Sequence, residues 1–225
     1  MTITTTSHTL AVAGGRLRYE VRDDGPLLLI VGAPMGAKPF AALAEAMAQD
    51  HTVVTHDPRG ISVCVLDDPE QDSTPDLRAA DVAALLDALG AATADVFGSS
   101  GGAVTGLALV TGHPGRVRTL VAHEPPLLEL LADAAGRRAE VDDIVETFRR
   151  DGQAAAFGKL MASAGFDAEA SGAGGDDGGH DDDGWASPRS GSPGATAASW
   201  SSPPRSPTCR VGCSATGDRD QVTRL

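Results

Sequence analysis

One serine in this sequence has neighbours that could support nucleophilic catalysis. Ser100 is the central residue of Gly98-Ser99-Ser100-Gly101-Gly102, which fits the pattern G-x-S-x-G. A turn this tight between a strand and a helix needs small flanking residues, so that the serine backbone can be strained and its hydroxyl projects above the sheet. In a chain with 27 glycines the pattern is also compatible with a flexible glycine-serine turn. Ser99 is the competing serine, and the spacing of the glycines disfavours it.

A catalytic serine also needs N–H donors for the negative charge that develops on its substrate. The backbone N–H of Gly101 is one expected oxyanion donor, because it lies at the N-terminus of the predicted helix, where the dipole favours an anion. The second is expected from the loop 32–36, where Pro34 has no N–H and Ala33 is therefore the better candidate. Removing one such donor typically costs ~2.7–4 kcal/mol of transition-state stabilisation.

The elements that must position these residues alternate between strand and helix patterns. Runs of apolar or alternating residues predict strands at 16–21, 27–31, 52–55, 94–97 and 119–122, and helices at 39–49 and 103–111. A further helix has clear ends, with Ser73 or Thr74 as N-cap, Pro75 at its first position and Gly90 after its last turn. This alternation predicts an α/β fold with a parallel sheet.

Four segments resemble the α/β-hydrolase fold family in their order and separations: 27–36, 56–60, 98–102 and 121–126. The match covers roughly residues 10 to 165. It is similar to small bacterial members with a helical cap inserted after the strand that ends near His123. The resemblance implies a mostly parallel sheet with helices on both faces, and a serine hydrolase that acts on an ester, amide or related acyl bond.

The resemblance also implies roles for particular residues. Ser100 matches the family nucleophile, and Gly101 and Ala33 match its oxyanion positions. Val31 is a departure, because many members have histidine before the glycine. Epoxide opening and halide displacement use a carboxylate nucleophile at the serine position in their usual members, so Ser100 argues against both.

The base and the acid of a catalytic triad have several candidates. His123 ends a predicted strand on the side where ligands bind in open α/β sheets. His113 lies in a helix-ending turn, and His180 lies in an acidic linker, where a base would lose its positioning. Glu124 occupies a place that some members use for the acid. Its carboxylate could equally well have a structural role at the N-terminus of a following helix, where the dipole favours negative charge. Asp220 resembles the acid in the glycine-aspartate turn of many members, after a short predicted strand at 209–215.

Composition divides the chain into three parts. We expect a hydrolase-like core at 1–125, a helical cap segment at 126–165, and an acidic Gly/Asp linker followed by a Ser/Pro-rich tail at 166–225. The last part has too few large apolar side chains to offset its ordering entropy, which predicts disorder. One hypothesis is that the tail results from a frameshift, a truncation or a wrongly assigned reading frame, since the last strands and the histidine of the family pattern are missing. The sheet would then have an exposed edge.

Charge and motif content limit the kinds of partner and cofactor that we expect. A formal net charge of −13 argues against nucleic acid. Three cysteines without zinc-type spacing predict neither a disulfide scaffold nor a metal site, and no nucleotide, flavin or haem motif suggests a cofactor. The N-terminus lacks signal-peptide features and no apolar run is long enough for a membrane helix, so we expect a soluble cytoplasmic protein. The oligomeric state is not indicated.

Two functions from different classes follow. The first is a serine hydrolase that acts on a small-molecule ester through an acyl-enzyme at Ser100. The alternative is a catalytically inactive α/β-hydrolase remnant, or a small-molecule binding protein, that lacks the base histidine.

Overall fold

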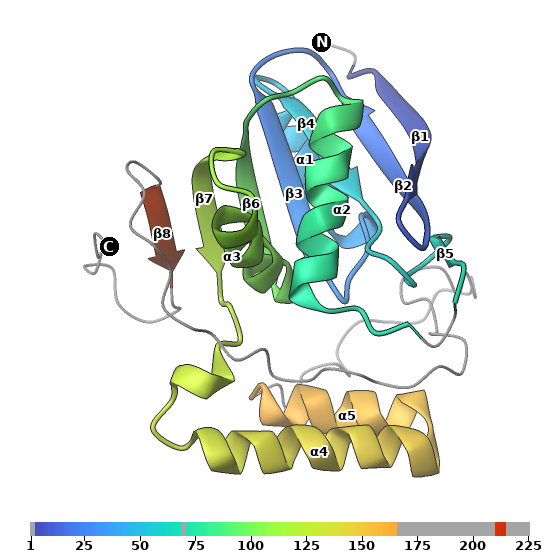
Figure 1. Ribbon diagram of the computed structural model, residues 1–225, viewed down its shortest axis with the longest axis vertical. Coiled ribbons are helices and arrows are strands. Elements are labelled where there is room, and N and C mark those ends of the chain that lie inside the picture. Colours follow the sequence, from blue (N-terminus) through green and yellow to red (C-terminus); the bar gives the residue numbers. More distant parts are fainter. Residues whose placement is uncertain (1–2, 69–70, 166–209, 215–225) are drawn as a thin grey trace, which may run out of the picture. The chain divides into compact units, whose positions relative to one another are not determined.

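The computed structural model describes residues 3–68, 71–165 and 210–214, whose elements are drawn in Figure 1. One sheet has the strand order β1-β2-β4-β3-β6-β7-β8, with β5 paired to β2. The strands are β1 (Thr5–Val12), β2 (Gly15–Arg22), β3 (Leu27–Ala33), β4 (Thr52–His56), β5 (Val65–Leu66), β6 (Ala94–Ser100), β7 (Val117–His123) and β8 (Arg210–Ser214). The neighbouring pairs β4–β3, β3–β6, β6–β7 and β7–β8 are parallel. The pairs of β2 with β1, β4 and β5 are antiparallel. The predicted α/β fold with a mostly parallel sheet is confirmed.

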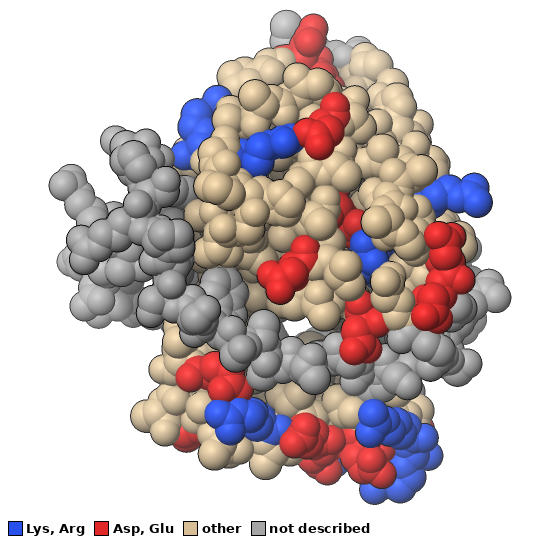
Figure 2. Space-filling view, viewed as in Figure 1, with Lys and Arg blue, Asp and Glu red and all other residues tan. Residues whose placement is uncertain are grey.

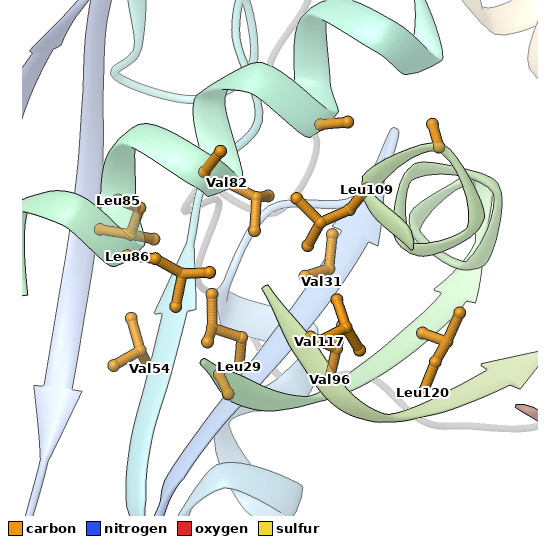
Figure 3. Packing of buried hydrophobic residues seen from close by; sticks show 14 of the residues in the cluster. Leu29, Val31, Val54, Val82, Leu85, Leu86, Val96, Leu109, Val117 and Leu120 are labelled. Atoms are coloured by element: carbon orange, nitrogen blue, oxygen red, sulfur yellow. The ribbon is translucent and has the colours of Figure 1, made fainter. Parts of the chain in front are cut away.

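Helices cover both faces of the sheet, as predicted. On one face, α2 (Pro75–Ala88) and α3 (Gly101–Gly112) pack against the central strands, and α1 (Ala41–Met47) lies on the other face after a short 3-10 turn at Lys38–Phe40. Figure 3 shows the α2 side of the core, where Val82, Leu85 and Leu86 point at Leu29 and Val54 of the sheet. Burial of these apolar side chains is the main force that fixes the helices on the strands.

The N-terminus of α2 is capped by a side chain. The Thr74 hydroxyl accepts a hydrogen bond from the Leu77 N–H at 3.2 Å, and Pro75 is the first helical residue. After the helix, Gly90 adopts a φ of 66°. Of the two N-cap residues that the sequence allowed, the structure selects Thr74.

Two strands were not predicted. Residues 16–21 were expected in the edge region of the sheet and form most of β2, the second strand from the edge, but β1 outside them was missed. Most side chains of β1 are exposed and polar, so this strand has no apolar alternation to detect. The two-residue β5 is too short for a pattern. In addition, α3 begins at Gly101 rather than at residue 103, because the turn before it is tighter than the apolar pattern indicated.

Described residues 127–165 belong to a second compact unit. It contains a 3-10 turn (Leu128–Leu130), α4 (Ala134–Asp151) and α5 (Gln153–Ser163), and the two helices lie side by side (Figure 1). Between them, Gly152 has a φ of 86°, and Lys159 of α5 pairs with Asp143 of α4 at 2.5 Å. Figure 2 shows basic and acidic side chains of this unit next to each other. Helices were predicted here; their role as a cap stays a prediction.

Little of the C-terminal part is described. Within residues 166–225 the structure describes only β8. This strand pairs with β7 in a register that joins Thr119 to Arg210 and His123 to Ser214. A strand was predicted at 209–215, and the structure describes it at Arg210–Ser214, next to β7. The predicted disorder, the acidic linker with His180, and Asp220 lie outside the described residues. No helix in the described parts of the chain has the length and apolarity needed to cross a membrane.

Candidate active site

Ser100 occupies the junction between β6 and α3. It is the last residue of the strand and the residue before the helix, with a φ of 54° and a ψ of −123°. A non-glycine residue at positive φ costs of the order of 1–3 kcal/mol, so the surrounding structure must enforce it. The backbone strain predicted at this serine is therefore present, and it lies at the carboxyl edge of the parallel strands, where open α/β sheets bind ligands.

Two glycines permit this junction. A Cβ atom on Gly102 would lie 2.0 Å from the carbonyl oxygen of Val31, and one on Gly98 would lie 2.6 Å from the carbonyl oxygen of Gly102. Both obstacles are backbone atoms, which cannot rotate away as a side chain does. Any larger residue would push α3 off the sheet, so the small neighbours that the sequence predicted for Ser100 are required by the packing.

The two expected oxyanion donors lie next to each other beside Ser100. Ala33 is the register partner of Ser100 in the parallel pair of β3 and β6. A Cβ atom on Gly101 would lie 2.7 Å from the carbonyl oxygen of Ala33, which shows how closely the two backbones approach. Gly101 is also the first residue of α3, whose dipole adds positive potential at this point. Backbone pairing thus brings together residues that are far apart in the sequence.

A buried carboxylate supports the loop that follows β3. The Ala37 N–H donates to Oδ1 of Asp57 at 2.8 Å, and Asp57 comes directly after β4 with 3% of its surface exposed. Arg18 Nη1 lies 3.7 Å from the other carboxylate oxygen. From the sequence, Asp57 was predicted only as part of a segment that matches the family. Its signal was the motif His-Asp-Pro-Arg-Gly after a buried strand, which placed a polar side chain at the sheet edge.

The same motif contributes a buried ion pair. Arg59 donates to both carboxylate oxygens of Asp81 in α2, at 2.8 and 2.6 Å, and each residue is 3% exposed. A further Arg59 donor reaches Gln71 at 2.9 Å. Burial lowers the pKa of the neighbouring His56, although Asp81 and Asp57 act in the opposite direction, so this imidazole is held neutral. The pair ties the loop after β4 to α2; it does not reach Ser100.

His123 contacts the competing serine. Its Nδ1 lies 3.3 Å from Oγ of Ser99, its register partner on β6, and its ring stacks on Phe97 with the centroids 6.1 Å apart. Within the described residues, the Ser100 side chain makes no hydrogen bond with His123. The arrangement therefore brings the predicted base to the strand end next to Ser100, but bonded to a different hydroxyl.

The other two described candidates for the triad, Glu124 and His113, lie at different places relative to Ser100. Glu124 directly follows His123 at the carboxyl edge, where it is exposed and adopts a φ of 49°. His113 caps the opposite end of α3 from Ser100, which separates it from the site by the length of the helix. Among the described residues, no three His, Cys, Asp or Glu side chains gather closely enough to hold a metal ion.

Comparison with known proteins gives consistent matches. A family model described as alpha/beta hydrolase fold matches residues 25–165. The uncharacterized hydrolase YraK of Bacillus subtilis is 36% identical over 152 residues, which cover 66% of this chain and 56% of that protein. A zearalenone hydrolase of Bionectria ochroleuca is 34% identical over 123 residues, covering 52% and 47% of the two chains. The chain thus spans about half the length of the curated relatives it matches.

Solved structures give a similar result. A hydrolase from Pseudomonas aeruginosa PA01 superimposes with a TM-score of 0.54 at 25% identity, over 61% of this chain and 52% of that one. A variant of an epoxide hydrolase from Bacillus megaterium gives a TM-score of 0.53 at 19% identity, over 59% and 49%. The second likeness concerns the fold alone.

Proposed function

The chain belongs to the α/β-hydrolase fold family, and on this basis we propose that it is a serine hydrolase that cleaves an ester or related acyl bond through an acyl-enzyme at Ser100. The observation that carries the proposal is the strained Ser100 at the junction of β6 and α3, with the backbones of Gly101 and Ala33 beside it. Strain at a serine between a strand and a helix is the geometry that exposes a nucleophile.

The proposed reaction uses this geometry in two steps. Oγ of Ser100 attacks the substrate carbonyl carbon, and its proton passes through a base to the leaving alkoxide. The N–H groups of Gly101 and Ala33 hold the negative oxygen of the tetrahedral intermediate, and the dipole of α3 adds to their effect. Water then attacks the acyl-serine by the same route, which releases the acid and restores the hydroxyl.

We assign His123 as the base and Glu124 as the acid of this proposal. For His123 to act on Ser100, its imidazole must exchange the Ser99 hydroxyl for the neighbouring one. The two serines follow each other at the end of β6, and Ser99 is the register partner of His123, so the proposal requires the imidazole to turn from Ser99 towards Ser100. A base must come within about 2.6–3.2 Å of the hydroxyl that it deprotonates.

The relatives support a small-molecule substrate. The zearalenone hydrolase at 34% identity is named for the hydrolysis of a small molecule. The epoxide hydrolases resemble this chain in fold, but Ser100 occupies the position where their usual chemistry needs a carboxylate. An acyl bond therefore suits this nucleophile better than an epoxide.

A second function is favoured by one specific observation. His123 is hydrogen-bonded to Ser99, and within the described residues no histidine bonds to Ser100, as expected in an inactive remnant or in a small-molecule binding protein. Such a protein would keep the Ser100 turn and bind a ligand at the same sheet edge without forming a covalent bond.

A fluorophosphonate probe distinguishes the two functions. We expect the full chain to be labelled at Ser100, as mapped by mass spectrometry of its peptides, and Ser100→Ala to take no label while Ser99→Ala remains reactive. Hydrolysis of p-nitrophenyl acetate should depend on the same hydroxyl. An unlabelled chain that still binds hydrophobic ester ligands would be the binding protein.

A further inference from the structure

Arg78 links α2 to the first turns of α3. Its Nε donates a hydrogen bond to Oγ1 of Thr105 at 3.0 Å, and its Nη1 donates to the carbonyl oxygen of Ser73 and, at 3.2 Å, to the Ser73 hydroxyl. The arginine therefore spans from the start of one helix to the buried side of the other. Nothing in the α/β pattern of the sequence requires a cation at this place.

Thr105 connects Arg78 to Gly101, the residue after the proposed nucleophile. It is fully buried, at 0% exposure, and its hydroxyl donates to the carbonyl oxygen of Gly101 at 3.0 Å. A threonine hydroxyl in a helix often bonds to the carbonyl four residues earlier. Here a guanidinium can only donate, so the Thr105 oxygen must accept from Arg78, and its one proton must go to Gly101.

In the described part of the chain, no carboxylate is hydrogen-bonded to Arg78. Asp81 acts on Arg78 through its charge, but both oxygens of Asp81 already accept from Arg59. Within the described residues, the hydrogen bonds of Arg78 all go to uncharged oxygens. Burial lowers its pKa to about 10, which still leaves it protonated at neutral pH. A partly buried cation without a carboxylate hydrogen bond is unfavourable for stability, so a functional reason is worth seeking.

We propose that Arg78 is a positioning residue for the oxyanion site, which acts through Thr105 to hold Gly101 and the start of α3 in the orientation that binds a negative oxygen. The inference rests on the proposed function, because it assigns Gly101 as an oxyanion donor. Arg78 would act through two effects. The relay Arg78–Thr105–Gly101 fixes the first turn of the helix, and the positive charge adds to the dipole potential at its N-terminus.

The test measures the second-order rate at which a fluorophosphonate labels Ser100 in the full chain. Arg78→Met and Thr105→Val should each slow labelling by about tenfold, less than the 10²–10³ typical of removing a direct oxyanion donor. Their combination should be no slower than either alone, because both interrupt one relay. Thr105→Ser keeps the hydroxyl and should label at the wild-type rate, and Arg78→Lys should fall between wild type and Arg78→Met.

Arg116→Met is the matched control. Arg116 is also partly buried, and its side chain bonds to α2 through Asp87 at 2.7 Å and the Ala83 carbonyl at 3.3 Å, but among the described residues that side chain makes no hydrogen bond to α3. It should label at the wild-type rate even if it lowers the melting temperature. Thermal unfolding of each variant gives the folded fraction, so that a loss of stability is not counted as a loss of rate.

The outcomes separate the two proposals. If the wild-type chain takes no label at Ser100, the hydrolase proposal fails and the relay fails with it. If wild type is labelled but the folded Arg78→Met, Arg78→Lys and Thr105→Val proteins react at its rate, the relay is wrong and the hydrolase proposal stands. Slow labelling in Arg116→Met as well would also overturn it, because the effect would then be general to α2.

Discussion

The neighbouring strands β6 and β7 end in very different ways at the same edge of the sheet. At the end of β6, Ser100 is fixed by a positive φ and by contacts so close that only glycine fits around it. At the end of β7, the His123 side chain makes one hydrogen bond of 3.3 Å to Ser99, and Glu124 is exposed. The groups that would stabilise charge are set by the backbone, whereas those that would move a proton are side chains.

This difference follows from what each task needs. Oxyanion donors are backbone N–H groups, so the pairing of β3 with β6 and the start of α3 are enough to orient them. A base needs a side chain in one rotamer within hydrogen-bond reach of one hydroxyl, and further groups must hold it there. The proposed oxyanion donors therefore depend on contacts within the described core, and the proposed base depends more on its surroundings.

The largest expected effect concerns the β7 end. Under the hydrolase proposal, His123→Ala lowers p-nitrophenyl ester hydrolysis by about 10²–10⁴-fold, the usual contribution of a general base. Ser99→Ala, which removes only the observed partner of His123, is the control and should leave hydrolysis within the range of wild type or raise it, because the imidazole is freed for Ser100. Equal rates in wild type and His123→Ala would show that His123 is not the base.

Substitutions next to the end of β6 should change the stability of the protein. Gly102→Ala places a Cβ atom 2.0 Å from a carbonyl oxygen of β3, which we expect to cost about 3 kcal/mol or more of the free energy of unfolding. Gly112→Ala at the other end of α3 has nothing within 4 Å of the added atom and should be neutral or stabilising by up to about 1 kcal/mol. Urea denaturation measures both. Similar values for the two variants would contradict the close packing at the Ser100 turn.

A smaller loss is expected where the loop after β3 is anchored. Asp57→Ala leaves the buried Ala37 N–H without its acceptor, at a cost of about 1–3 kcal/mol of unfolding free energy. Asp57→Asn keeps an acceptor oxygen and should lose less. If both variants have the same urea midpoint, the carboxylate acts through its charge and Arg18 rather than through this hydrogen bond.

The smallest effect is expected at the amino ends of the same strands. Arg118 of β7 donates to Asp95 of β6, with Nε at 3.0 Å from Oδ1, and these hydrogen bonds hold the pKa of Asp95 below its usual value. A lowered folded-state pKa stabilises the protein above the unfolded pKa of about 3.9, and the contribution is lost as the pH falls through the lowered value.

Urea midpoints of wild type at pH 6 and pH 3 should therefore differ slightly more than those of Asp95→Asn. Asp50→Asn, which breaks no ion pair of the described residues, is the control. A larger pH dependence in Asp95→Asn than in wild type would reverse the sign and reject the assignment.

Much of the fold could be predicted from the sequence, because the central strands and α2 carry their own signals. The apolar run of β3 and the capped start of α2 at Thr74 are local patterns. By contrast, β1 is mostly exposed and was missed, since it is held mainly by pairing with β2 and has few apolar side chains on the core. The networks of Arg59 with Asp81 and of Arg78 with Thr105 were also missed, because their members are 22 and 27 residues apart.

A serine in a glycine-flanked turn between a strand and a helix could be predicted from residue types alone, because so tight a turn needs small neighbours. That Ala33 lies opposite Ser100 and that His123 bonds to Ser99 follows from the folded structure. Which hydroxyl an imidazole reaches depends on the register of two strands and on one rotamer. Neither quantity is encoded in the spacing of residues along the chain, since both arise only when the strands pair.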